Sequence, residues 1–242
     1  MLVLDLTLET PEANLALDEA LLEWSEETDG PEILRFWRSP THFVALGYGN
    51  HVQTETFSAY CQHHHIPILR RPSGGGAVLQ GPESLSFALI LNMDRTDLSG
   101  GVACANRCVI RRNSEALASI RPDLDIRVQG HSDITINTKK ISGNAQRRKK
   151  FRLLFHGAFL MEPCWDLMSK TLQLPARKPD YRGDRDHQDF LTTLPISESD
   201  VKAALMQTWD CHKSLELPTQ VSDWVNQLIE TKYKSAAWNF KF

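Results

Sequence analysis

The segment from residue 70 to residue 76 reads Arg-Arg-Pro-Ser-Gly-Gly-Gly. Three successive glycines cost backbone entropy, and they are retained mainly where the chain must approach another group closely. Their bare N–H groups can hold an anion, and the two arginines add forked donors suited to carboxylate or phosphate. A flexible turn with two solvated arginines explains the same pattern. The run is not a Walker loop, because no Gly-Lys-Ser/Thr follows, and it is not GxGxxG. It marks a loop between strands.

The residues around this run predict strands and helices in a mixed pattern. Ile68–Arg70 is a short strand before it, and Leu85–Leu91 after it is apolar nearly throughout, as in a central strand buried on both faces. Further strands are expected at Ile33–Trp37, Phe43–Leu46, Leu124–Val128, Asp133–Ile136 and Arg152–Met161. Helices are expected at about residues 12–27 and at Thr54–His63, Val102–Ile120, Trp165–Leu172, Ser199–Thr208 and Gln220–Glu230. We therefore expect an α/β fold of the α+β type, a mixed, largely antiparallel sheet flanked by helices, with Ala176–His187 as a mobile polar loop.

A second informative segment runs from Ser132 to Gln146. It predicts a hairpin that turns at Asn137-Thr138, presents a lysine on the returning strand, and then opens into a loop of small residues. Lys139 and Lys140 are adjacent, so on a strand they point to opposite faces and only one can serve a given pocket. Such a lysine can neutralise a phosphate or polarise an acyl carbonyl. A solvated hairpin lysine is the alternative interpretation.

The third segment is Phe155–Leu160, an apolar strand that contains His156 and Gly157. The glycine permits close backbone approach. His156 is either a hydrogen-bonded core histidine or part of a site. The run from His63 to His65 does not indicate a metal site, because adjacent side chains diverge and no cluster of Cys, Asp or Glu completes a coordination shell.

The composition is that of an ordinary globular protein. The chain has 242 residues, of which 41% are hydrophobic and 24% charged, and we expect a single domain over residues 1–242, with two small domains as the alternative. A formal net charge of −3 gives no broad attraction for nucleic acid. No stretch is long and apolar enough to span a bilayer, and the first residues carry acids where a signal peptide carries bases, so we expect a cytoplasmic protein. Five cysteines without a CxxC pair favour free thiols.

Taken together, these segments resemble the lipoate-protein ligase and octanoyltransferase family, within the wider biotin and lipoate ligase fold. The hallmarks are the arginine pair with its serine and glycine run, the lysine segment that begins at Lys140, and the His156-Gly157 strand, and all three occur in family order. Residues 14–19, Asn-Leu-Ala-Leu-Asp-Glu, and residues 238–240, Trp-Asn-Phe, extend the resemblance over essentially the whole chain. Lipoate fits better than biotin, because the glycine run and the lysine segment resemble the lipoate branch.

The resemblance implies a two-step reaction with ATP, assisted by Mg²⁺. Lipoate or octanoate and ATP form an acyl-adenylate and pyrophosphate, and a lysine of an acceptor protein domain then attacks the adenylate. Lys140 is the implied catalytic residue, which holds the carboxylate and the α-phosphate and stabilises negative charge. Asp133 is implied to contact magnesium or phosphate. Arg70 is implied to donate hydrogen bonds to an anionic group, and Ser73, Gly74, Gly75 and Gly76 are implied to lie beside the acyl chain and the adenylate. Ser142, Gly143, Asn144 and Ala145 are implied to line the adenylate. His156 and Gly157 are implied to form the floor of the acyl pocket.

A transferase of the same fold is the alternative. In such an enzyme a cysteine takes the octanoyl group from acyl carrier protein as a thioester, and its thiolate must lie beside the lysine. Neither Asp123–Thr138 nor Pro175–Arg185 contains a cysteine, which favours the ligase and leaves an atypical, cysteine-independent octanoyl or lipoyl transferase as the rival. A non-catalytic lipoyl-binding protein is a third hypothesis, and the presence of Lys140 and Asp133 argues against it.

Two features of the chain depart from the family pattern. The best-known ligases carry His-Asp after the glycine run, where this chain has Gln80-Gly81, so the role of that pair has no direct counterpart. Large ligases also have an accessory domain; we expect none in this chain, and either a small partner subunit supplies that part or the chain works without it. The basic residues Arg147, Arg148, Lys149 and Lys150 suit docking of an acidic acceptor domain, with a solvated turn as the alternative.

Overall fold

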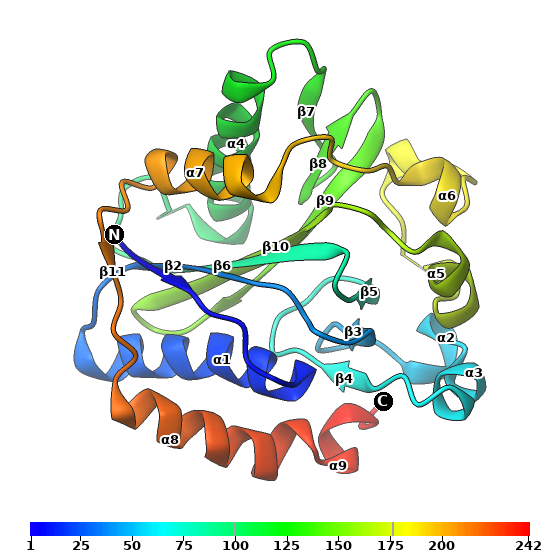
Figure 1. Ribbon diagram of the computed structural model, residues 1–242, viewed down its shortest axis with the longest axis horizontal. Coiled ribbons are helices and arrows are strands. Elements are labelled where there is room, and N and C mark those ends of the chain that lie inside the picture. Colours follow the sequence, from blue (N-terminus) through cyan, green and yellow to red (C-terminus); the bar gives the residue numbers. More distant parts are fainter. Residues whose placement is uncertain (99, 176) are drawn as a thin grey trace.

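The protein is described by a computed structural model over residues 1–98, 100–175 and 177–242. Figure 1 shows a layered molecule in which a large twisted sheet lies between helices. Helix α1 (Pro11–Thr28) packs against one face of the sheet, and α8 (Thr219–Leu228) packs against the outer side of α1. Helices α4 (Gly101–Ile120) and α7 (Glu198–Thr208) cover the other face. The expected fold class, a sheet flanked by helices, is confirmed.

Within the described residues the large sheet has eight strands. In order across the sheet these are β11 (Lys213–Ser214), β1 (Leu2–Asp5), β2 (Ile33–Trp37), β6 (Ser84–Asn92), β10 (Arg152–Leu160), β9 (Lys139–Arg148), β8 (Asp133–Ile136) and β7 (Ile126–Gln129). The pairs β11–β1 and β1–β2 are parallel, and all pairs from β2 to β7 are antiparallel. The sheet is therefore mixed and largely antiparallel, as expected.

A smaller sheet and several short helices complete the described structure. The smaller sheet has the order β4 (Ile68–Arg70), β3 (Phe43–Leu46) and β5 (Val78–Gln80). The short helical elements are α2 (Val52–Glu55), α3 (Ser58–His63), α5 (Trp165–Thr171), the 3-10 turn η1 (Asp180–Arg182), α6 (His187–Phe190), the π turn η2 (Ile229–Tyr233) and α9 (Ala236–Asn239). Among the described residues, no helix combines the length and the apolar character that a membrane crossing requires.

Strand β6 lies at the centre of the hydrophobic core. Phe87 and Leu89 point into the cluster beneath α4 and α7, whereas Ala88 and Ile90 point into the cluster beneath α1 and α8. All four side chains are buried, because successive residues of a strand face opposite sides. The prediction of a central strand buried on both faces is confirmed.

Helix α1 begins and ends with clear local signals. The Thr10 hydroxyl accepts a hydrogen bond from the Ala13 amide, and Pro11 occupies the first turn, where a missing N–H costs nothing. At the other end Asp29 adopts a left-handed conformation with φ of 52°. Leu17 and Leu21 are fully buried between these ends. The predicted helix at about residues 12–27 is confirmed, with one further residue at each end.

The helix predicted over Thr54–His63 is interrupted. The structure has α2 and α3 instead, separated at Thr56 and Phe57, because Thr56 adopts an extended conformation. Its hydroxyl donates to the Val52 carbonyl, which is a local bond that competes with continuation of the helix. The Phe57 amide donates to the Thr171 carbonyl next to α5. A tertiary contact thus overrides the helical pattern.

The lysine hairpin forms as predicted, but the segment after it does not. Asn137 and Thr138 both have positive φ, at 48° and 69°, as a two-residue hairpin turn requires. Ser142–Gln146 was expected to be a loop of small residues and is instead the middle of β9. The small residues are explained by packing: an added Cβ at Gly157 on β10 would lie 2.1 Å from the Asn144 Oδ1 atom. The expectation of a loop is wrong.

Residues 177–190, which we call the strap, cross the end of the sheet near the lysine hairpin. They contain η1 and α6 rather than only irregular chain. The Arg185 guanidinium donates to the Thr138 carbonyl at the hairpin turn, and the Thr192 amide just beyond the strap donates to the Lys140 carbonyl. Ala176, the first residue of the predicted mobile loop, lies outside the described residues. The chain is therefore tied to the hairpin within the strap and just beyond its C-terminal end.

Candidate functional site

A cavity of about 710 Å³ lies where the large sheet, the small sheet and the strap meet. Its walls come from α1, β2, β3, β5, β6, the β8–β9 hairpin, β10 and α5, with the strap on one side. A volume of several hundred Å³ is typical of a small-molecule site. The cavity therefore brings together segments that are far apart in the sequence.

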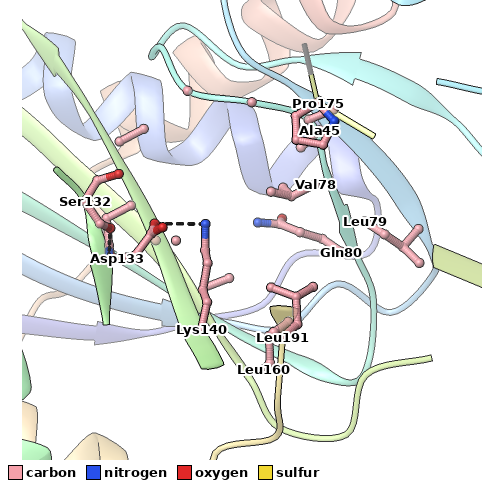
Figure 2. Close-up of a pocket in the computed structure, with 18 of the residues that line it drawn as sticks. Ala45, Val78, Leu79, Gln80, Ser132, Asp133, Lys140, Leu160, Pro175 and Leu191 are labelled. Atoms are coloured by element: carbon pink, nitrogen blue, oxygen red, sulfur yellow. Dashed lines mark hydrogen bonds and ion pairs between the residues drawn. The ribbon is translucent and has the colours of Figure 1, made fainter. Parts of the chain in front are cut away.

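Lys140 forms the polar centre of this cavity. Its ammonium group lies 2.9 Å from the Asp133 Oδ1 atom across the hairpin, a contact drawn in Figure 2. The Tyr181 hydroxyl of the strap donates to the other carboxylate oxygen of Asp133, at 2.7 Å. An added Cβ at Gly143 would lie 2.7 Å from the Lys140 Nζ atom, so only glycine leaves room for the ammonium there. The lysine is held in place.

Lys139 has the opposite environment. Its side chain is exposed, whereas Lys140 lines the cavity. This is the alternation expected for neighbours on a strand. The prediction that only one of the two lysines serves the pocket agrees with their positions.

The strap adds further cationic side chains to the cavity, namely Arg177, Lys178 and Arg182. His187 of the strap also lines the cavity. Burial, followed by the charge of Arg182, lowers the pKa of His187, so its imidazole is neutral at pH 7. The polar part of the cavity therefore favours an anionic ligand.

Another part of the cavity is apolar. Leu15 from α1, Trp37 from β2, Ala45 from β3, Leu79 from β5 and Phe87 from β6 contribute to its wall. Figure 2 places Val78 and Gln80 of β5 across from Lys140. Gln80, which stands where the family pattern has a histidine, thus lines the site. A ligand with a hydrocarbon body and an anionic head matches these two surfaces.

Arg71 organises the glycine run. Its guanidinium donates to the carbonyls of Ala45, Gly74 and Gly76, at 2.7 to 2.9 Å, and its Nε donates to the Ser73 hydroxyl. Burial lowers the pKa of Arg71 to about 10, which still leaves it charged at neutral pH. Gly75 and Gly76 line the cavity. Arg71, which also lines the cavity, thus fixes the shape of the glycine loop.

Arg70 does not play the role expected of it. It is fully buried and lies outside the cavity wall, and its guanidinium donates to carbonyls in two places. The acceptors are the carbonyls of Gly47, Tyr48, Asn50, Trp238 and Asn239. Because its donors are used to join the loop after β3 to the C-terminal segment, Arg70 offers none to a substrate anion. The expectation of a substrate contact is wrong for this arrangement.

Ser73 and His156 contact each other. The Ser73 Oγ atom lies 2.5 Å from the His156 Nε2 atom, and the other ring nitrogen lies 3.6 Å from the Asp18 Oδ2 atom. The Asp18 carboxylate also accepts from Arg35, at 2.5 Å. His156 and Asp18 line the cavity, whereas Ser73 does not. The histidine is thus both a cavity residue and a hydrogen-bonded buried residue.

The predicted site residues separate into two groups. Lining the cavity are Lys140, Asp133, Gly75, Gly76, Gly143, Asn144, Ala145, His156 and Gly157. The residues that do not line it are Arg70, Ser73 and Ser142, which are buried, and Gly74, which is exposed. Sequence reasoning missed several lining residues, namely Asp18, Trp37, Arg71, Tyr181, Arg182 and His187. The last three lie in the strap, whose many charged residues were the available signal in the sequence. The sequence predicts only a mobile loop there.

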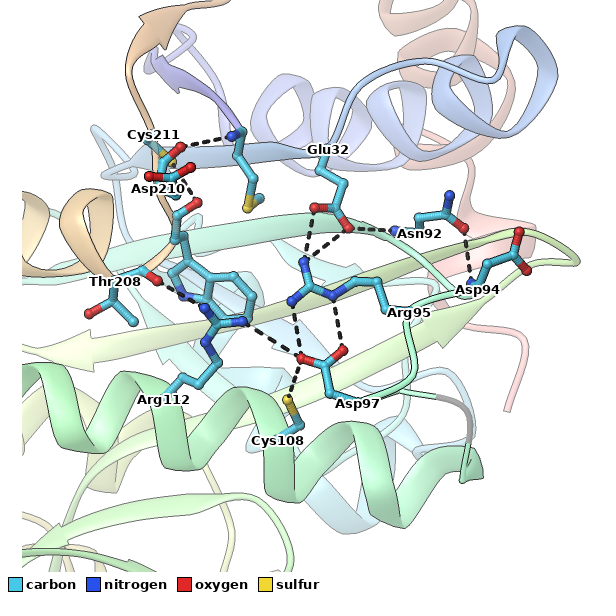
Figure 3. A network of polar contacts seen from close by, with 12 residues as sticks. Glu32, Asn92, Asp94, Arg95, Asp97, Cys108, Arg112, Thr208, Asp210 and Cys211 are labelled. Atoms are coloured by element: carbon cyan, nitrogen blue, oxygen red, sulfur yellow. Dashed lines mark hydrogen bonds and ion pairs between the residues drawn. The ribbon is translucent and has the colours of Figure 1, made fainter.

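The thiols lie away from the cavity. Among the described residues that line it, none is a cysteine. Figure 3 shows Cys108 of α4, whose thiol donates to the Asp97 carboxylate at 3.3 Å. Burial and that carboxylate raise the pKa of Cys108 to about 11. Burial also raises the pKa of Cys61 and of Cys211. These thiols are poorly suited to act as thiolates.

Carboxylates are sparse around the cavity. The described residues contain no group of three or more His, Cys, Asp or Glu side chains that could hold a metal ion. Asp133 and Asp180 are carboxylates in the polar part of the wall. Mg²⁺ is often held by one or two carboxylates together with substrate phosphates, so this donor set fits a magnesium ion carried in with a nucleotide.

Comparison with known proteins identifies the family of this chain. Residues 10–207 match the family described as the lipoyl protein ligase A/B catalytic domain. Octanoyltransferase LipM of Halalkalibacterium halodurans is 26% identical over 96% of this chain and 95% of its own length. Lipoate-protein ligase A subunit 1 of Thermoplasma acidophilum is 28% identical over 97% of this chain and 95% of its own. A solved structure of a bi-partite lipoate protein ligase and its E2 lipoyl domain from Thermoplasma acidophilum has a TM-score of 0.80 at 25% identity, over 99% of this chain and 95% of that one. The chain therefore belongs to the lipoyl protein ligase A/B catalytic domain family.

Proposed function

We propose that this enzyme is a lipoate-protein ligase. It activates lipoate, or octanoate, with ATP to an acyl-adenylate and transfers the acyl group to a lysine of an acceptor protein. The observation that carries the proposal is the composition of the cavity wall, which joins an apolar surface to a cationic one around Lys140 without a cysteine among its described residues. A hydrocarbon acid and a nucleotide phosphate suit such a wall.

In the first step a carboxylate oxygen of the acid attacks the α-phosphorus of ATP, and pyrophosphate leaves. Both reactants are anions, so bringing them together requires a cation between them. Lys140 supplies it, and Asp133 fixes its direction through the 2.9 Å ion pair. A positioned ammonium stabilises the negative charge that develops on the phosphate oxygens, and it costs no reorganisation at that moment.

In the second step the amine of the acceptor lysine attacks the acyl carbonyl of the mixed anhydride. The new amide bond forms as the bond to the phosphate oxygen breaks, and AMP leaves with the electron pair. Lys140 remains beside the carbonyl and the phosphate, where it stabilises the charge on both. His156, held by Ser73, lies with Gly157 in the wall against which the acyl chain packs.

Magnesium, when it accompanies ATP, would neutralise phosphate charge. Asp133 and Asp180 are the residues of the polar wall that would hold it.

The second candidate function is octanoyl transfer from acyl carrier protein. It is favoured by the similarity to octanoyltransferase LipM, at 26% identity. A thioester mechanism needs a thiolate beside the lysine, and the thiols of this chain lie elsewhere with raised pKa values at Cys61, Cys108 and Cys211. A transferase of this chain would therefore have to work without a cysteine.

Pyrophosphate release distinguishes the two functions. With lipoate, ATP and Mg²⁺ the enzyme is expected to release pyrophosphate, and Lys140→Ala is expected to reduce the rate by about a hundredfold or more. Lys139→Ala is the matched control, because the neighbouring side chain is exposed and should leave the rate unchanged. Full activity of Lys140→Ala would remove the assignment.

A parallel reaction with octanoyl acyl carrier protein and no ATP tests the transferase. Acyl transfer there, with no pyrophosphate in the first assay, would establish the second candidate. Replacing the partly exposed Cys104, Cys108 and Cys164 by serine should not alter pyrophosphate release. Loss of activity in that variant would contradict a ligase that uses no thiol. If neither assay gives turnover while lipoate still binds, the chain is a binding protein.

We also propose the domain organisation and the protein partners of this enzyme. Residues 1–242 act as one catalytic domain, and the acceptor is a lipoyl domain. A small accessory subunit is a further expectation, because the ligase of Thermoplasma acidophilum is described as bi-partite. Acyl transfer to a lipoyl domain, measured with this chain alone and then with a candidate second subunit, tests both points.

A further inference from the structure

The strap places a buried cation in the wall of the cavity. Arg182 is 5% exposed, lines the cavity, and donates one hydrogen bond from Nε to the Arg185 carbonyl. Its Nη2 atom is buried and has no hydrogen-bond partner among the described residues. A guanidinium Nη atom carries two N–H donors, so both donors of the Arg182 Nη2 atom are unused.

Other buried arginines of this chain have more hydrogen-bond partners, although the Nε atom of Arg35 also lacks one. Arg35 pairs with the Asp18 carboxylate and also donates to the side chain of Asn14. Arg71 donates to three carbonyls and one hydroxyl. Burying a charge without a counter-charge is strongly unfavourable. The unused donors of Arg182 therefore indicate that its partner is a ligand.

The neighbours of Arg182 hold it in place without satisfying it. Its guanidinium lies 4.6 Å from the Phe190 ring centroid, which fixes the plane of the fork. Asp186 and Asp133 are close enough to act on it through their charge, but neither accepts a hydrogen bond from it. Burial lowers the pKa of Arg182. The guanidinium group of Arg182 is thus preorganised and available to bind an anion.

Charge balance decides which anion fits. Lys140 is already paired with Asp133 at 2.9 Å, so these two side chains together contribute no net charge. His187 is neutral at pH 7, because burial and nearby cations lower its pKa. A carboxylic acid brings one negative charge, whereas a phosphate chain brings several, and a planar fork matches two phosphate oxygens at once. Arg182 adds a buried planar donor to the cationic side chains that already line the cavity, among them Arg177 and Lys178.

We propose that Arg182 is a substrate-binding residue whose guanidinium binds the phosphate chain of the nucleotide substrate, with pyrophosphate as the group it holds when the adenylate forms. The proposal rests on the proposed ligase function and deepens it. The same phosphate chemistry is present in the phosphopantetheine arm of an acyl carrier protein, which is the donor in the transferase alternative. The experiment must therefore test both sources.

Binding of inorganic pyrophosphate and of ATP to the intact protein is measured by calorimetry for the native chain, Arg182→Met and Arg182→Lys. Arg182→Met should bind pyrophosphate about tenfold to a hundredfold more weakly, because charge-assisted bonds are lost. Arg182→Lys keeps the charge and loses the fork, so its affinity should fall between the two. Arg111→Gln on α4 removes the same charge from an exposed side chain and should bind like the native protein.

Thermal unfolding separates a ligand-binding residue from a structural one. Without ligand, Arg182→Met should unfold at the native temperature or above, because an unpartnered buried cation is replaced by an apolar group of similar length. Pyrophosphate should raise the unfolding temperature of the native protein but not of the variant. A variant that unfolds well below the native protein, or that binds pyrophosphate with native affinity, would overturn the proposal.

The source of the phosphate is tested with 4′-phosphopantetheine as a second probe. Arg182-dependent binding of pyrophosphate with little binding of phosphopantetheine supports the nucleotide site. The reverse result overturns the nucleotide assignment and the ligase function together, because it assigns the fork to an acyl carrier protein. If the native protein forms the adenylate but Arg182→Met binds pyrophosphate with native affinity, only the role of Arg182 is overturned.

Discussion

At the scale of single residues, small differences in position decide whether a side chain contributes to the cavity or only stabilises the fold. Arg70 and Arg71 are adjacent, yet Arg70 is used to join the C-terminal segment to the fold and Arg71 shapes the glycine loop at the cavity. The sequence predicts the loop and the arginine pair correctly. It cannot say which arginine faces the ligand, because the direction depends on carbonyls such as Asn239 that are distant along the chain.

Gly157 is a residue at which close approach is required. An added Cβ would lie 2.1 Å from the Asn144 Oδ1 atom on the neighbouring strand, so Gly157→Ala must push the Asn144 side chain toward the acyl pocket. We expect a loss of about 1–3 kcal/mol of stability from overpacking. The KM for lipoate should rise about tenfold.

Denaturant unfolding and steady-state kinetics measure these two effects. Gly49→Ala is the matched control, because an added Cβ there meets nothing within 4 Å and Gly49 does not line the cavity. Both quantities should stay at the native level in the control. A native KM in Gly157→Ala would show that the pocket tolerates the methyl group and would remove Gly157 from the acyl wall.

At the scale of elements, the site depends on how the strap meets the lysine hairpin. Tyr181→Phe removes the hydroxyl that donates to the Asp133 Oδ2 atom and keeps the ring, whose centroid lies 5.2 Å from that of Phe190. Burial and the Asp133 charge raise the pKa of Tyr181, so the hydroxyl remains a donor throughout the working pH range. Without it Asp133 should position Lys140 less firmly.

We expect adenylate formation by Tyr181→Phe to slow about tenfold, with about 1 kcal/mol less stability from the lost hydrogen bond. Pyrophosphate release and thermal unfolding measure both. Tyr48→Phe serves as the control, since Tyr48 is 44% exposed and no hydrogen bond is formed by its hydroxyl among the described residues. An unchanged rate in Tyr181→Phe would mean that the strap only covers the cavity.

The elements also show where sequence reasoning succeeds. The observed bounds of the strands Ile33–Trp37 and Phe43–Leu46 agree with the prediction, because short, mainly apolar runs, interrupted here only at Arg35, indicate buried strands. The strap was missed, because no hydrophobic period marks it. Its conformation comes from contacts with residues such as Thr138 and Asp133, more than forty positions earlier in the chain. Such tertiary contacts leave no local signal.

At the scale of the whole molecule, the cavity is closed by parts of the chain that do not resemble one another. The glycine run, the lysine hairpin and the strap each approach from a different direction, and the central strands hold them at fixed distances. The order of three short segments was enough to predict the family. The strap, which forms the remaining wall, could not be predicted from those segments, because only the packed sheet brings Arg182 into the same cavity as Lys140.

The same sheet determines where a protein acceptor can lie. Arg147 at the end of β9 and Lys150 in the turn after it are exposed, whereas Lys149 pairs with Glu23 of α1 at 2.7 Å. Eight residues of extended strand separate Lys140 from Arg148, or about 27 Å. A folded domain of about eighty residues has a radius of gyration of about 12 Å. One acidic domain can therefore contact this turn and still present a lysine to the cavity.

Reversing both charges, as Arg147→Glu with Lys150→Glu, should slow acyl transfer to a lipoyl domain several-fold and leave pyrophosphate release unchanged, because only the second step requires the acceptor. The defect should shrink as salt is added, since exposed charges are screened. Lys170→Glu with Lys234→Glu makes the same net change at exposed sites on α5 and beyond η2, and should transfer at the native rate. Equal transfer by both double variants would place the docking surface elsewhere, and a fall in pyrophosphate release would mean that the turn supports the fold rather than the partner.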